Sequence, residues 1–145
     1  LLYSDQKQAR ENSKNKGEVV SDDRFKKCPA TLEAHNGSGE AVDFIDIAAD
    51  KEGNCFCGIE NKKLGIAVTL QFPKKQLPWL TSWQHFAKGE YVTGIEPGTH
   101  PPIGQARARK EGSLILLEPG ESRRYDLELN VLTDENSIQS FKNNL

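Results

Sequence analysis

The most chemically distinctive stretch of the chain is YVTGIEPGTHPP, residues 91–102. Glu96 ends an apolar run, where a carboxylate is partly shielded from water and is placed to act as a proton acceptor. Pro97 cannot continue an interior ladder of a sheet, and Gly98 allows the backbone to turn sharply. His100 follows in a loop stiffened by prolines. These residues predict a catalytic base at Glu96; the alternative is a strand that simply ends in a charged turn.

Other acidic side chains could act together with this carboxylate. Glu90 and Glu96 together suggest a glycosidase, but six residues along one strand separate them by about 20 Å, which is too far for the two carboxylates of that mechanism. Asp43, Asp46 and Asp50 could supply hydrogen bonds to sugar hydroxyls. Spaced acids on an exposed strand are also common, so both interpretations of these aspartates remain open.

The basic and imidazole side chains give weaker signals. His35 lies in a polar loop and is expected to face water. His85 is expected to be a structural histidine of a strand, and His100 is the best candidate of the three for a functional role. Arg107, Arg109 and Lys110 form a local basic patch, which indicates either solvated helix charges or a contact for a phosphate or sugar acid.

The cysteines do not form a disulfide framework, because there are only three: Cys28, Cys55 and Cys57. Cys55 and Cys57 are two residues apart in a predicted strand, so they should share a face. Such a pair can ligate a metal, but no second pair accompanies it. We therefore expect small buried residues, no metal and no cofactor, in a reducing cytoplasm.

Size and charge limit the class of protein. The 145 residues suffice for one domain with a real core. The 19 basic and 21 acidic residues nearly cancel, which argues against a nucleic-acid-binding surface. No apolar run is long enough for a membrane span, and no signal peptide is evident. The chain begins at Leu1 and has no Met, which suggests a processed or truncated protein.

Short β-rich runs separated by turn signals predict an all-β sandwich with a short C-terminal helix. The first 17 residues are mostly polar and are expected to form a flexible arm, with the sandwich domain over residues 18–145. Two helices are predicted, at 104–111 and 134–145. The strands are predicted at 41–47, 55–59, 64–72, 77–86, 91–95, 113–117 and 125–132.

Four segments together resemble the C-terminal region of aldose 1-epimerase-like proteins, in the galactose-mutarotase-like superfamily. These segments are LPWLTSW (77–83), GEYVTGIEPG (89–98), ARARKEG (106–112) and LEPGESRRYDLELNVL (117–132). GEAVDFIDIAAD (39–50) resembles the preceding strand of that family less closely. The resemblance covers most of the chain from about residue 30 and marks it as the C-terminal half of such a fold.

The resemblance implies a β-supersandwich that binds a hexose in a groove of its sheet. By its place in the motif, Glu96 would take the proton from the anomeric hydroxyl, and Trp83 would offer an aromatic face to the sugar. His100, Asp46 and Arg109 would be further substrate contacts. The acid histidine of the family lies in the N-terminal half, outside this chain.

Two positions depart from the family pattern: Ile45 stands where relatives tend to have a histidine, and Gly104-Gln105 replaces a usual Gly-Arg. Three functions are therefore compatible with the sequence. The first is an aldose 1-epimerase-like protein that binds a hexose. The second is a non-catalytic carbohydrate-binding module or sugar sensor, and the third is a structural or assembly domain. Half a supersandwich would expose apolar faces, so a homo-oligomer or a missing N-terminal half is expected as partner.

Overall fold

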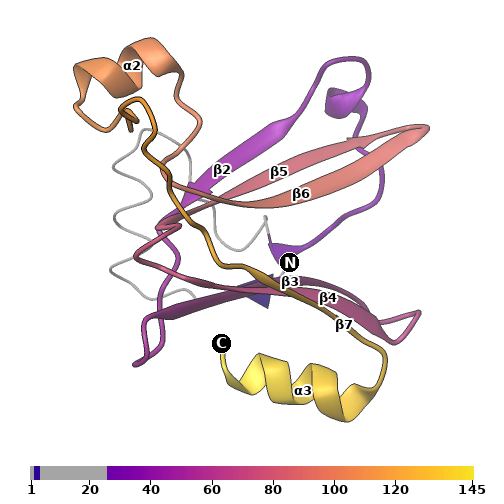
Figure 1. Cartoon of the computed structure of the whole chain (residues 1–145). Helices are drawn as coiled ribbons and strands as arrows, with labels where there is room; N and C mark the ends of the chain where they lie inside the picture. The colour runs from indigo at the N-terminus through magenta and orange to yellow at the C-terminus, as the bar shows by residue number, and fades with distance from the viewer. Residues whose placement is uncertain (1, 4–25) are drawn as a thin grey trace.

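The computed structural model describes residues 2–3 and 26–145. These residues form two antiparallel sheets, which lie one above the other, and a helix below the lower sheet (Figure 1). The strands are β1 (Leu2–Tyr3), β2 (Ala41–Ile45), β3 (Asn54–Asn61), β4 (Ile66–Pro73), β5 (Trp79–Ala87), β6 (Glu90–Gly98) and β7 (Glu128–Leu132). The helices are the 3-10 turn η2 (Glu33–His35), α2 (Gln105–Lys110) and α3 (Glu135–Asn143).

The strand order is β1-β3-β4-β7 in the first sheet, called sheet A here, and β2-β5-β6 in the second, called sheet B. Two pairs of neighbouring strands, β3–β4 and β5–β6, follow one another along the chain and are joined by tight turns, whereas β1–β3, β4–β7 and β2–β5 pair across intervening elements. The connection between β6 and β7 crosses from sheet B to sheet A and contains α2 (Figure 1). The all-β sandwich predicted from the sequence is confirmed.

The hydrophobic core lies between the two sheets. Sheet B contributes Ile45 and Leu80, which are 3% and 0% exposed, and sheet A contributes Phe72 at 1%. Ile47, Cys55, Cys57, Leu70 and Leu77 complete the buried cluster. Side chains alternate between the two faces of a strand. Every second residue of β5 and β3 therefore enters this layer, and the residues between them must point out of it.

Helix α3 covers the outer face of sheet A. Asp134 begins the helix by accepting a hydrogen bond from the backbone N–H of Ser137 at 2.9 Å. Hydrogen bonds from the side chain of Ser137 and from its backbone hold the pKa of Asp134 below its usual value. Ile138 is buried at 5% exposed, and the ring of Phe141 meets that of Phe56 edge-on at 6.3 Å. The predicted closing helix is confirmed, with the bounds of α3.

The strand predicted at 113–117 is wrong, since these residues form no regular element. The backbone N–H groups of Ser113 and Leu114 both bond to the carbonyl of Ala108, which ends helix α2. Leu116 and Leu117 are 66% and 52% exposed. An apolar run becomes a strand only beside the edge of another strand, and none lies alongside this one in residues 26–145.

The N-terminal arm is placed only in part. Residues 2–3 form β1, in which Leu2 and Tyr3 pair with Gly58 and Cys57 of β3. The rest of the expected arm, residue 1 and residues 4–17, lies outside the described residues. The strand expected at 125–132 is shorter than predicted and begins at Glu128.

Strand β6 continues further than its sequence indicated. Glu96 was expected to end the strand, but β6 runs through Pro97, which lies opposite Leu80, to Gly98. Proline is tolerated at this point because β6 is the last strand of sheet B, so that one side of its backbone needs no ladder partner. Glu96 therefore lies within a strand, and the position of its side chain is set by the register with β5.

Cys55 and Cys57 share the inner face of β3, and both are 0% exposed, as their spacing predicts. Burial is the main cause that raises the pKa of Cys55 to about 11 and that of Cys57 to about 12. Cys28, by contrast, is exposed. Since a buried thiolate is poorly solvated, the folded protein holds both core thiols in their neutral form.

We predict that these two thiols make the fold sensitive to alkaline pH. Their folded pKa values lie above the ordinary 9.0, so their contribution to stability is complete below about pH 9 and is lost as pH rises toward 11 and 12. Each thiol adds a slope of up to about 1.4 kcal/mol per pH unit in that window. Urea denaturation at several pH values should show a smaller slope in Cys57→Ala. Cys28→Ala is the matched control, and an equal slope in all three proteins would contradict the prediction.

Candidate functional site

The outward face of sheet B brings together the residues that sequence reasoning singled out most strongly. In the ladder between β5 and β6, Trp83 lies opposite Gly94, and Thr81 lies opposite Glu96. Opposed residues of an antiparallel pair project on the same side of the sheet. Because Leu80 and Ile95 point into the core, these four side-chain positions point away from sheet A. We call this surface the Trp83 face, defined by Thr81, Trp83, Gly94 and Glu96.

Glu96 is exposed, and its side chain folds back along β6 over Gly94. A Cβ atom built at Gly94 would lie 2.6 Å from Oε1 of Glu96, closer than any real contact of this kind. The carboxylate therefore occupies space that exists only because residue 94 has no side chain. Since Gly94 lies opposite Trp83, the Glu96 carboxylate takes the place of a side chain at that position.

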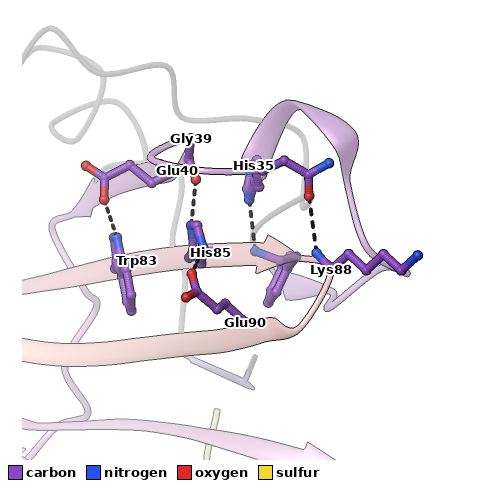
Figure 2. Close-up of polar contacts among 9 residues, drawn as sticks. His35, Gly39, Glu40, Trp83, His85, Lys88 and Glu90 are labelled. Atoms are coloured by element: carbon purple, nitrogen blue, oxygen red, sulfur yellow. Dashed lines mark hydrogen bonds and ion pairs between the residues drawn. The ribbon is translucent and has the colours of Figure 1, made fainter.

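The indole ring of Trp83 is held in place from one side. Its Nε1–H donates a hydrogen bond of 2.6 Å to Oε2 of Glu40, which precedes strand β2 (Figure 2). The ring also lies nearly parallel to that of His85, at an interplanar angle of 8° and a centroid distance of 6.2 Å. These two contacts fix the orientation of a half-buried aromatic ring, which is what a rigid binding platform needs.

His85 bridges the edge of β2 to β6. Its Nδ1 lies 2.6 Å from the carbonyl oxygen of Gly39, so this nitrogen carries a proton and donates it. Its Nε2 faces Oε2 of Glu90 at 3.3 Å (Figure 2). Both ring nitrogens thus face acceptors, and the side chain is 8% exposed. This arrangement agrees with the structural role that the sequence indicated for His85.

The prediction that His35 faces water is wrong. His35 is 7% exposed, and its Nδ1 accepts the backbone N–H of Phe86 at 3.0 Å. Asn36, the residue after η2, accepts the N–H of Lys88 through its side chain at 3.2 Å. Strand β2 begins only at Ala41. Side chains from η2 and the next residue therefore satisfy N–H donors at the end of β5 and just after it, which a polar sequence does not reveal.

The other predicted site residues lie away from the centre of the Trp83 face. His100 follows β6 and contacts the carbonyl of Pro101 through Nδ1 at 2.7 Å. Asp46 follows β2 and forms an ion pair with Lys74, whose ammonium group also bonds to the carbonyl of Ile47. Arg109 is exposed on α2, beyond the end of β6 (Figure 1).

Gly94, which belongs to this face, and Glu40, which contacts it, were not singled out from the sequence. The contact of Glu40 with Trp83 joins positions 43 residues apart, so no local pattern could reveal it. Gly94 did carry a signal, because glycine inside a strand often marks a close approach of other atoms.

The four best-formed hollows lined by described residues do not include Trp83 or Glu96. One hollow, with a volume of about 420 Å³, lies between α3 and the β3–β4 turn and is lined by charged residues such as Glu60 and Lys142. These two side chains pair at 2.7 Å. In residues 2–3 and 26–145, no three His, Cys, Asp or Glu side chains are grouped to hold a metal ion. Within the same ranges, no helix has the length and apolar character needed to cross a bilayer.

Comparison with known proteins gives one family and one structure. The model of a family described as "Domain of unknown function (DUF4432)" matches residues 4–131. The crystal structure of a "putative aldose 1-epimerase" from Klebsiella pneumoniae is similar, with a TM-score of 0.69 and 30% sequence identity. The match covers 79% of this chain but only 29% of the other. Among curated proteins, none matches at a significant level.

We predict that Glu40 controls the environment of one of the two indoles. In Glu40→Ala the Nε1–H of Trp83 loses its charged acceptor, so its proton resonance should move upfield and exchange faster with water. The indole resonance of Trp79 is the internal control and should keep its position in a proton–nitrogen correlation spectrum. Equal shifts of both indoles, or of neither, would contradict the assigned contact.

Proposed function

For a chain that belongs to the DUF4432 family, we propose that the Trp83 face binds a hexose and that Glu96 accepts the proton of its anomeric hydroxyl. The observation that carries this proposal is the ladder register, which sets the Trp83 ring and the Glu96 carboxylate on one outward face. The aldose 1-epimerase-like fold supports it. The chain spans 29% of the matched structure, so any activity of a whole protein of that length is part of the proposal.

Binding would depend first on Trp83. A pyranose has one face rich in C–H groups, which packs against an aromatic ring, while its hydroxyls need polar partners. Trp83 presents such a ring, fixed by Glu40 and stacked on His85. Gly94, opposite the ring, has no side chain of its own, so the Glu96 carboxylate can fold back to this position. A sugar ring lying on Trp83 would then have its edge near residue 96.

The chemical step would be ring opening and closure. Glu96 would take the proton of the anomeric hydroxyl, the bond between the anomeric carbon and the ring oxygen would break, and that oxygen would receive a proton from an acid. The open-chain aldehyde would then rotate and close again with either hand. Glu96 suits the role of base because it is exposed on the face, beside a glycine, and bound to no cation in the described residues.

Binding without turnover is the second candidate function, and the position of His85 favours it. His85 lies opposite Val92, whereas Glu96 lies opposite Thr81, so four residues of strand, or about 13 Å, separate the two rows. That distance is too great for both groups to reach one anomeric centre. His85 is moreover occupied by Gly39 and Glu90. A sugar-binding module that leaves the acid to another polypeptide fits this geometry.

Outlying residues would contribute to affinity rather than to the chemical step. His100 has its Nε2 available in the part of the chain that the structure describes, two residues after the end of β6. Arg109 is an exposed cation that could contact a phosphate or acid group of a sugar derivative. Asp46 would have to leave Lys74 to reach a sugar hydroxyl, so its contribution is expected to be the smallest.

We predict that Glu96→Gln separates binding from turnover. The amide keeps the size of the side chain but cannot accept the proton, so exchange between the α and β anomers should slow by about 100-fold or more, while sugar binding persists. Saturation-transfer and exchange NMR with free hexoses measures both quantities in one sample. Glu118→Gln, in an exposed turn, is the matched control.

The outcomes distinguish the two candidates. Catalysed exchange in the wild type that survives in Glu96→Gln would remove Glu96 from the mechanism. Binding without exchange in the wild type would support the non-catalytic module. If no hexose or hexose phosphate binds the wild-type chain, the proposal is wrong for this chain as it stands.

A second prediction concerns the glycine opposite Trp83. In Gly94→Ala the new methyl group would meet Oε1 of Glu96 at 2.6 Å, so the carboxylate must move. We expect any catalysed anomer exchange to fall by at least about tenfold, with a smaller loss of sugar affinity, because Trp83 remains in place. Thermal unfolding should change little, since the displaced atom is the end of a flexible side chain. A variant with unchanged exchange would show that the position of this carboxylate does not matter.

A further inference from the structure

A stripe of exposed apolar residues runs along β7 and the segment before it. Tyr125, Leu127, Leu129 and Val131 alternate along the chain and are 44%, 47%, 59% and 55% exposed. Alternation places Leu129 and Val131 on one side of β7, and Tyr125 and Leu127 continue the same spacing in the segment before it. We call these four residues the β7 stripe. Single exposed apolar side chains are common, but four in register on one face are typical of a contact surface.

The β7 stripe is a continuation of the core face of sheet A. Leu129 lies opposite Leu70 of β4, and Val131 lies opposite Val68. Leu70 is 8% exposed, because it belongs to the cluster between the sheets, whereas Leu129 beside it is 59% exposed. Sheet B therefore covers the inner face of sheet A at Leu70 but not at Leu129 on the neighbouring strand. The apolar surface of sheet A thus extends one strand beyond the part that sheet B covers.

The backbone of β7 is also open on one side. β7 is the last strand of sheet A among the described residues, so its outer edge has no ladder partner there. The N–H of Asp126 points back to Gln76, which follows β4, at 2.6 Å. By alternation, the N–H and C=O groups of Leu127, Leu129 and Val131 point to the open edge. Residues 125–132 contain no lysine or proline, the usual means of protecting an edge strand.

We propose that this edge binds a second copy of the chain, with the two β7 strands antiparallel about a two-fold axis at Leu129. The two four-stranded A sheets then become one continuous sheet of the dimer. Each Leu129 lies opposite its own mate, and Leu127 lies opposite Val131 of the partner strand. The open backbone groups named above are those that such a pairing joins by hydrogen bonds.

Side-chain charges select this register over its neighbours. A two-fold axis at Leu127 would set Asp126 against Glu128 of the other copy, and an axis at Glu128 would set two Glu128 carboxylates together; like charges directly opposed are unfavourable. An axis at Leu129 instead sets Glu128 against Asn130, which can donate to it.

Another feature agrees with an axis at Leu129. A shift by a single residue would set Leu129 against Glu128 and bring apolar side chains onto the polar face. Of the registers compared, only that with the axis at Leu129 is self-complementary, which is the reason to assign a second copy rather than an unrelated strand.

The first test is the mass of the chain in solution, measured by light scattering over a range of concentrations. We predict twice the 16.2 kDa of one chain for the wild type. Leu129→Lys sets two ammonium groups together at the axis, so the dimer should weaken by at least about tenfold. Leu64→Lys is the matched control, because Leu64 is 72% exposed in the β3–β4 turn, away from the β7 stripe, and the dimer should persist.

The second test locates the axis and does not depend on a disruptive change. Opposed residues of a hydrogen-bonded antiparallel pair have Cα atoms about 5.5 Å apart, which suits a disulfide. In a Cys28→Ser background, Leu129→Cys should form a covalent dimer under mild oxidation. Leu64→Cys should not form one, and the native Cys55 and Cys57 are too buried to react.

Either of two results would overturn the proposal. One is a wild-type chain that stays monomeric at the highest concentrations used for NMR, which would assign the β7 stripe to a different polypeptide. The other is a dimer that is unaffected by Leu129→Lys and gives no crosslink through Leu129→Cys. A dimer lost in Leu129→Lys and crosslinked at residue 129 supports the arrangement, whatever the outcome of the sugar experiments.

Discussion

Burial of one apolar layer between the two sheets determines the rest of this structure. Leu80 of β5 and Phe72 of β4 are almost inaccessible to water. Because side chains alternate along a strand, burial of Leu80 makes Thr81 and Trp83 point outward. Glu96 lies opposite Thr81 in the register of β5 and β6, so its side chain points outward as well. The candidate site is thus a consequence of the core, although none of its residues belongs to the core.

The same constraint explains the position of the β7 stripe. β7 joins sheet A in register with β4, so its odd-numbered residues must take the face that Leu70 takes. On β4 that face is covered by sheet B at Leu70 and Phe72, while Val68 is 36% exposed, and on β7 it is largely open. β7 therefore carries apolar side chains, such as Leu129 and Val131, that remain exposed to solvent. The fold leaves an apolar surface at one edge and a polar, aromatic one on the outer face of sheet B.

Polar contacts do the finer positioning around β5. Glu40 holds the Trp83 indole, Gly39 and Glu90 hold the His85 ring, and His35 satisfies a donor of the strand where β2 has not yet begun (Figure 2). All of these partners except Glu90 come from the segment just before β2. This short segment, polar and unremarkable in sequence, therefore orders the side chains at one end of the Trp83 face.

The sequence by itself determined the fold class, most of the strands, the closing helix and the shared face of Cys55 and Cys57, because these follow from local alternation and turn chemistry. It also selected Glu96 and Trp83 through an ordered set of motifs. It could not place His35 in the structure or exclude a strand at 113–117, since both depend on which strand edge lies nearby. Only the tertiary structure set Gly94 opposite Trp83 and Glu96 opposite Thr81. It also brought Glu40 to the indole of Trp83. The reason is physical: alternation fixes which face a side chain takes, but its neighbours across the sheet come from distant segments whose register no local pattern encodes.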